Sequence, residues 1–94
     1  MNSQNVRECV LHNSQGLHAR PASLFVQSAQ QFQADVELCN LTTGMTADGK
    51  SVLSMLMLAA PCGTKLRLTV NGSDGAEAIK VLGDLLESGF DDDE

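Results

Sequence analysis

The chain has 94 residues, of which 43% are hydrophobic and only three are aromatic, so we expect one small domain with a mainly aliphatic core. Its twelve acidic residues outnumber its six basic ones, which argues against nucleic-acid binding, because such binding depends on neutralising phosphates with Lys and Arg. No apolar stretch approaches the ~20 residues of a membrane helix, and the first residues lack the features of a secretory signal. We therefore expect a cytoplasmic protein without membrane insertion.

Hydrophobic periodicity and turn residues divide the chain into closely spaced strands and helices. In chain order, the predicted elements are a strand over 5–13, a helix over 20–32, a strand over 35–41, a short strand within 42–48, a helix over 51–59, a strand over 64–70 and a helix over 76–88. The order is therefore β-α-β-β-α-β-α. We interpret residues 1–90 as one domain and the acidic residues 91–94 as a solvated tail.

The strand over 64–70 has the clearest pattern, since Leu66, Leu68 and Val70 alternate with polar residues. Such alternation predicts a sheet that is buried on one face only, which is typical of antiparallel sheets. The predicted fold class is α+β: an open two-layer sandwich in which all helices cover one face of an antiparallel sheet.

The segment 16–22, with the sequence GLHARPA, places a histidine directly before the first predicted helix. The start of a helix favours anions, and neutral imidazole is a nucleophile. Arg20 adds a planar cation suited to phosphate, Pro21 fits the first helical turn, and Gly16 permits a tight turn that leaves the imidazole uncovered. The combination indicates that His18 accepts and releases a phosphoryl group. The alternative is a histidine that only caps the helix or packs at a strand end.

The predicted helix after Ser51 is too apolar for its length. Ser51 is a candidate N-cap, and some of the apolar residues that follow it should remain exposed. The residues expected to remain exposed are some of Val52, Leu53, Leu56 and Met57. An exposed apolar patch commonly marks a docking surface, and a phosphate on Ser51 would place negative charge beside it. The alternative is a helix that is fully buried in a small core.

Residues 44–51, with the sequence GMTADGKS, match the phosphate-loop pattern G-x-x-x-x-G-K-[ST]. The competing hypothesis is thus a small enzyme that binds a nucleoside triphosphate. Such domains need a parallel sheet built from several β-α-β units, for which this chain is too short. No later apolar strand ends in an Asp that could hold magnesium.

The remaining candidates for chemistry are few. Cys9, Cys39 and Cys62 are far apart and form no Cys-x-x-Cys pair, so we expect small buried hydrophobic residues rather than a disulfide or a zinc site. We expect no metal and no cofactor.

Three further polar residues are expected to be solvated. His12 is interpreted as a surface residue near the end of the first strand. Asp84 and Glu87 share one side of the last helix, and without a cleft we expect them to be solvated rather than to act as an acid–base pair.

Three motifs together resemble the histidine-containing phosphocarrier (HPr) family of the bacterial phosphoenolpyruvate-dependent phosphotransferase system. They are the segment 16–22, the segment 49–51 followed by an apolar helix, and Gly63 and Thr64 opening an alternating strand. The resemblance extends over about residues 6–87. It implies the fold of the family, an open-faced β-sandwich of four antiparallel strands with three helices on one face, and the predicted element order agrees with this fold.

The resemblance implies a specific chemistry. His18 would accept a phosphoryl group on Nδ1 from enzyme I and pass it to a histidine of an enzyme II A component. Arg20 would contact the phosphoryl group, and Gly16 and Pro21 would shape the site. The protein would then be a carrier rather than a turnover enzyme, and we expect a monomer.

The resemblance also implies regulation and docking. Ser51 matches the position that an HPr serine kinase/phosphatase modifies in some bacteria, and Val52, Leu53 and Leu56 match an apolar docking patch. Some positions depart from the family pattern, where Ser, Asn or Lys is common; these are Gln15, Gln27, Gln30 and Ser54. Fewer cations weaken attraction to acidic partners. The alternative function is therefore a regulatory or nitrogen-branch HPr paralogue that acts mainly as a protein-binding module.

Overall fold

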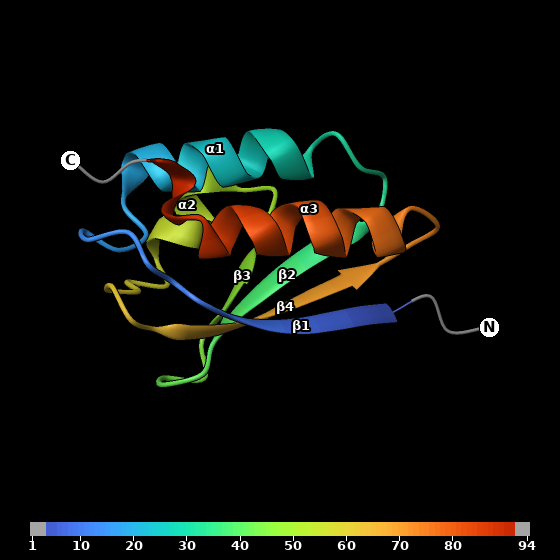
Figure 1. The fold of residues 1–94 in the computed structure, drawn as a ribbon. Coiled ribbons are helices and arrows are strands. Elements are labelled where there is room, and N and C mark those ends of the chain that lie inside the picture. The colour runs from blue at the N-terminus through green and yellow to red at the C-terminus, as the bar shows by residue number, and fades with distance from the viewer. Residues whose placement is uncertain (1–3, 92–94) are drawn as a thin grey trace.

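The computed structural model describes residues 4–91, and its element order agrees with the predicted β-α-β-β-α-β-α pattern (Figure 1). The elements are β1 (Gln4–Val10), α1 (Ala19–Ala29), β2 (Asp35–Asn40), β3 (Thr46–Asp48), α2 (Val52–Leu56), β4 (Lys65–Asn71), α3 (Gly75–Glu87) and the short 3-10 turn η1 (Gly89–Asp91). The acidic tail predicted over 91–94 begins at the last described residue, and 92–94 lie outside the described residues.

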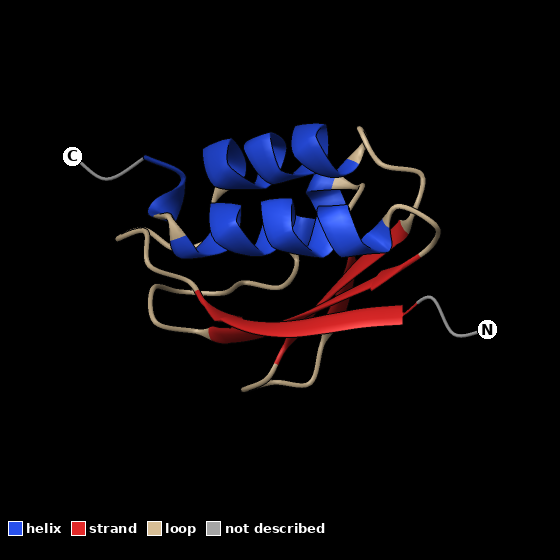
Figure 2. Ribbon diagram, turned by 45° about the vertical axis from the view of Figure 1, so that its right-hand side comes forward, coloured by secondary structure: helices blue, strands red, loops and turns tan. Residues whose placement is uncertain are grey.

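The strands form one antiparallel sheet in the order β1-β4-β2-β3. β1 pairs with β4 along its whole length, from Gln4 opposite Asn71 to Val10 opposite Lys65. β2 pairs with the other side of β4 and with β3. All three helices lie on one face of the sheet, and the opposite face is uncovered (Figure 2). The predicted open-faced sandwich is confirmed.

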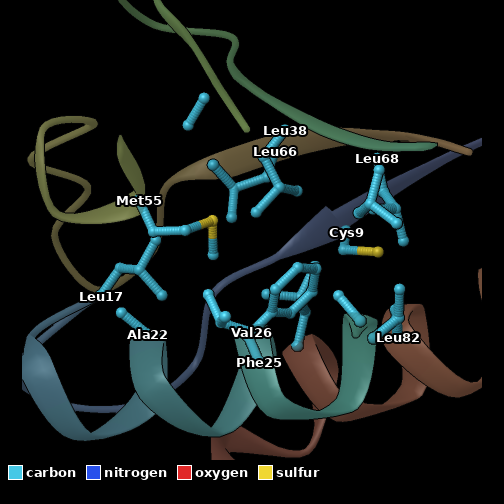
Figure 3. Close-up of a cluster of buried hydrophobic side chains, with 14 of the residues drawn as sticks. Cys9, Leu17, Ala22, Phe25, Val26, Leu38, Met55, Leu66, Leu68 and Leu82 are labelled. Atoms are coloured by element: carbon cyan, nitrogen blue, oxygen red, sulfur yellow. The ribbon is translucent and has the colours of Figure 1, made fainter. Parts of the chain in front are cut away.

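The core lies between the sheet and the helices. In β4, Leu66, Leu68 and Val70 are fully buried, as the alternation predicts. Figure 3 shows Phe25 of α1 and Leu82 of α3 directed toward this sheet face. Both side chains are fully buried, so each helix is held to the sheet mainly by apolar burial. Within residues 4–91, no helix is both long enough and apolar enough to cross a bilayer.

Three elements end earlier than predicted. β1 ends at Val10 rather than at 13, α1 at Ala29 rather than at 32, and α2 at Leu56 rather than at 59. After α1 and after α2, backbone N–H groups bond to carbonyls three residues back, which tightens the last turn. Ala59 then adopts a left-handed φ of 50° and ends the helical path.

The prediction that all three cysteines are buried is wrong. Cys9 is buried beneath α3, and this burial raises the pKa of its thiol. Cys39 is half-buried. Cys62 is exposed, with its Sγ 3.6 Å from the carbonyl oxygen of His12, because it lies in the turn that precedes β4. All three thiols are free.

Asp84 and Glu87 are ion-paired rather than merely solvated. Arg7 of β1 reaches α3, and its Nη2 lies 3.0 Å from one carboxylate oxygen of each residue. The hydrogen bond from Arg7 lowers the pKa of Asp84. The two carboxylates remain largely exposed, so the pairing fixes the Arg7 side chain more than it stabilises the fold.

Asp74 connects the start of α3 to the loop between α1 and β2. Its carboxylate accepts the backbone N–H of Gln33 at 2.8 Å and that of Ala34 at 2.9 Å. These backbone hydrogen bonds, that of Gln33 foremost, lower the pKa of Asp74. The carboxylate therefore stabilises this corner of the fold only while it is ionised.

We predict that Asp74→Asn removes an acid-sensitive part of the stability. A native pKa below the unfolded value of ~3.9 means that the contribution is present above that pH and is lost as the pH falls through the native pKa. Thermal unfolding from pH 7 to pH 2 should therefore show a lower Tm for Asp74→Asn at neutral pH and convergence with the wild type in acid. Asp35→Asn, at an exposed carboxylate of β2, is the control. A difference in Tm that does not change with pH would contradict the prediction.

Candidate functional site

His18 occupies the N-cap position of α1. Its backbone is extended, and its carbonyl accepts the N–H of Ala22 at 3.0 Å, which starts the helix. The half-buried imidazole makes no capping hydrogen bond. His18 therefore starts α1 through its backbone, and its side chain makes no capping hydrogen bond of the kind that the alternative requires. The imidazole lies at the positive end of an eleven-residue helix, where a negatively charged group is stabilised.

The loop before His18 is held against the segment that follows α2. The N–H of Leu17 donates to the carbonyl of Ala60 at 2.9 Å. Gln15, Leu17, His18, Ala59, Ala60 and Pro61 line a shallow hollow of about 200 Å³. The histidine therefore lies at the rim of a small open depression, which leaves room for a group the size of phosphate.

Gly16 is required both by its backbone and by its neighbours. Its φ is +73°, which disfavours residues with a Cβ atom. A Cβ there would also lie 2.4 Å from the carbonyl oxygen of Ala60 and 2.8 Å from Cα of Pro61. The tight turn expected at this position is present, and the absence of a side chain allows the two loops to touch.

Arg20 and Pro21 both lie in the first turn of α1, as predicted. Arg20 is exposed and Pro21 is buried. The proline therefore anchors the helix start in the core, while the guanidinium lies on the surface within two residues of His18.

Ser51 caps α2 as predicted, since its Oγ accepts the N–H of Ser54 at 3.2 Å. The hydroxyl of Ser54 in turn accepts the N–H of Asp48 at 2.9 Å. Ser51 is half-buried at the helix start. A negative group there would meet the positive end of a helix of only five residues.

The apolar residues of α2 divide between core and solvent. Leu53 is 71% exposed, Met57 62% and Leu56 36%, whereas Val52 is half-buried against the core. Met55 is fully buried, and Figure 3 shows its side chain directed into the cluster of buried hydrophobic residues. The alternative of a fully buried helix is therefore wrong. α1 and α2 pack against each other, and Ala59 and Ala60, which follow α2, line the hollow beside His18, so the apolar patch and His18 belong to neighbouring elements.

Several residues around His18 carry no signal in the sequence. Ala59 and Ala60 line the hollow, but the pattern showed only that a helix ends near Pro61. Their position depends on contacts between segments that are far apart in the chain. The local feature that distinguishes this segment in the structure is the left-handed φ of Ala59.

Of the other candidates, His12 is exposed as expected. Among residues 4–91, no group of three or more His, Cys, Asp and Glu is placed to hold a metal ion.

The segment 44–51 does not form a phosphate loop. It comprises a turn, β3 and the start of α2, within a sheet that is antiparallel throughout the described chain. A Cβ at Gly49 would lie 2.4 Å from the side chain of Val36, so no phosphate fits against this glycine. Lys50 donates its Nζ to the carbonyl of Phe32 at 2.8 Å. The nucleotide-binding hypothesis is wrong.

Comparison with known proteins gives consistent matches. The family model described as "PTS HPr component phosphorylation site" matches residues 6–88. Phosphocarrier protein HPr of Neisseria meningitidis serogroup A is 39% identical over 82 residues, which cover 87% of this chain and 90% of that protein. The structure of HPr-C-His from Thermoanaerobacter tengcongensis has a TM-score of 0.87 and 34% identity, and covers 96% of this chain and 99% of that one.

A third relative is much longer. The multiphosphoryl transfer protein of Escherichia coli O157:H7 is 38% identical over 84 residues, and this chain spans 22% of its length. The matches and the fold define the class of the chain as a small α+β phosphocarrier domain. The chain belongs to the HPr family of phosphocarrier proteins of the phosphotransferase system.

We predict that Gly16→Ala destabilises the protein more than Gly44→Ala does. Gly44 also has a left-handed φ, of +81°, but a Cβ there meets nothing within 4 Å. Gly44→Ala should therefore lower the free energy of unfolding only by the conformational penalty, about 1–2 kcal/mol. Gly16→Ala should lower it by a further ~1–3 kcal/mol, because the loop before His18 and the segment after α2 must separate. Urea unfolding of both variants measures the difference, and equal losses would show that the close approach to Ala60 is unimportant.

Proposed function

We propose that His18 is the residue on which this chain carries a phosphoryl group. The observation that carries the proposal is the placement of a half-buried imidazole at the N-cap of α1, at the rim of a hollow. The membership in the HPr family supports the same chemistry. Arg20, two residues away on the surface, is the proposed contact for the phosphoryl oxygens.

The proposed reaction is a transfer between two histidines. The lone pair of Nδ1 of His18 attacks the phosphorus carried by enzyme I, so that one N–P bond forms while that of the donor breaks. The start of α1 and the Arg20 guanidinium stabilise the charge on the equatorial oxygens. The reverse process delivers the group to a histidine of an enzyme II A component. His18 then returns to its initial state, as a carrier requires.

We predict that His18→Ala abolishes phosphoryl acceptance without altering the fold. Intact mass is measured after incubation with phosphoenolpyruvate and a bacterial enzyme I. The wild type should gain one acid-labile phosphoryl group, and His18→Ala should gain none. His12→Ala is the matched control, because it removes the other, exposed histidine and should still be phosphorylated. Acceptance by His18→Ala would end the proposal.

Docking to both partners is proposed to use the exposed face of α2. Leu53, Leu56 and Met57 present apolar area beside the first helix, and such area is uncommon on a small monomer unless it binds a partner. Val52 contributes its partly exposed edge. Ser51 lies at the start of this patch, and its modification by an HPr serine kinase/phosphatase is the proposed means of regulation.

We predict that Ser51→Asp slows transfer from enzyme I by roughly tenfold, which corresponds to ~1.4 kcal/mol. The carboxylate adds a hydrated charge at the edge of the apolar patch. Ser73→Asp, in the exposed turn between β4 and α3, adds the same charge at a distance and should transfer at the wild-type rate. An unchanged rate for Ser51→Asp, measured by rapid quench, would show that this patch is not the contact.

A regulatory or nitrogen-branch role is the second candidate, favoured by the surface of α1. Gln27 is an exposed amide of α1 and Gln30 is an exposed amide at the C-cap of this helix, while the hydroxyl of Ser54 is bonded to the N–H of Asp48. The surface therefore offers little attraction to an acidic partner. If neither a general enzyme I nor the enzyme I of the host phosphorylates the chain, the second candidate, a protein-binding module, is supported. Phosphorylation by the enzyme I of the host alone would instead show a carrier with a specialised partner. The monomeric state and the cytoplasmic location remain predictions.

A further inference from the structure

Asn13 is a buried amide in the loop that joins β1 to α1. Its side chain is 0% exposed. The Nδ2 group donates to the carbonyl of Gly16, and the backbone carbonyl of Asn13 accepts the N–H of Gly16 at 3.0 Å. Within residues 4–91, Oδ1 accepts no hydrogen bond. A buried amide with an unpartnered oxygen is costly, so an apolar residue of the same shape would stabilise this position better.

The carbonyl of Gly16 is shared between Asn13 and the candidate phosphoryl acceptor. The N–H of His18 donates to the same oxygen at 3.0 Å. The peptide between Gly16 and Leu17 is therefore held on its oxygen side by two donors. Its nitrogen side is held as well, because the N–H of Leu17 donates to Ala60. Because the carbonyl and the N–H of this peptide are both hydrogen-bonded, the direction of the backbone that leads into His18 is fixed as well.

The C-terminal turn begins near this loop. An ideal Cβ built at Gly89 would lie 3.8 Å from the backbone nitrogen of Asn13, so the start of η1 is close to the backbone of Asn13. Phe90 follows with a left-handed φ of 61° and is 4% exposed. Because Asn13 is fully buried, its side-chain hydrogen bond to Gly16 operates away from bulk water, where such a bond is stronger.

We propose that Asn13 is a positioning residue for phosphoryl transfer: its side-chain amide fixes the Gly16 carbonyl and, through it, the orientation of His18. The inference rests on the proposed function of His18. It explains why a buried amide is retained at a position where packing alone favours an apolar side chain. Asn13 acts through the backbone and does not touch the phosphoryl group.

The test compares Asn13→Leu, Asn13→Ala and Val70→Ala. Leu has a shape close to that of Asn but no donor, so Asn13→Leu should keep a Tm above that of Asn13→Ala. Both Asn13 variants should lower kcat for transfer from enzyme I by about tenfold or more with KM within twofold of the wild type, because the docking patch is intact. Val70→Ala is the control for lost stability, since Val70 is also 0% exposed but lies in β4 opposite Asn5 and Val36.

A stable Asn13→Leu that transfers at the wild-type rate would overturn the inference. If Asn13→Leu does not fold, Asn13→Ala is compared with Val70→Ala. An equal fall in kcat for both variants would also overturn the inference.

Failure of the wild type to accept a phosphoryl group would instead refute the proposed function. Amide hydrogen exchange still tests the positioning role in that case. Exchange of the His18 N–H should accelerate at least tenfold in Asn13→Ala but not in Val70→Ala, and equal exchange would overturn the inference.

Discussion

Burial of a single face of the antiparallel sheet is the constraint on which the rest of this structure depends. β2 and β4 direct alternate side chains toward the helices, among them Leu38, Leu66 and Leu68. A shift of one residue in either strand would expose this set to water, so the register is strongly specified. Because all three helices must then share one layer, α1 and α2 are neighbours. The site and the apolar patch are adjacent as a consequence of this one-sided packing.

The sequence was sufficient for those features that depend on local pattern. The alternation around Leu68 predicted the open sheet, and Ser51 was recognised as an N-cap because the chemistry of capping requires only the residues that follow it. The excess of apolar residues in α2 predicted exposure of Leu53 and Met57. The candidate site around His18 was predicted in the same way, since histidine, arginine and proline lie within four positions of one helix start.

The features that escaped prediction join residues far apart in the chain. Arg7 reaches Glu87 across 80 positions, and Ala60 accepts a hydrogen bond from Leu17 in a different loop. Neither contact has a local pattern, because each arises only after the sheet and helices have packed. The early end of α2 is of the same kind, since the left-handed Ala59 carries the chain back toward the loop of His18. Sequence periodicity predicts helices and strands, whereas these long-range contacts determine how the loops pack against one another.

The order of the strands also determines how the uncovered sheet avoids joining another sheet. β3, at one edge, is only three residues long and ends in Asp48, so it offers few unpaired backbone groups to a neighbouring strand. β1, at the other edge, is longer but places Arg7 and Glu8 in its centre. Short or charged edges hinder strand addition between molecules. The molecule can therefore leave a whole face of its sheet in water without its edges acting as a template for fibrous assembly.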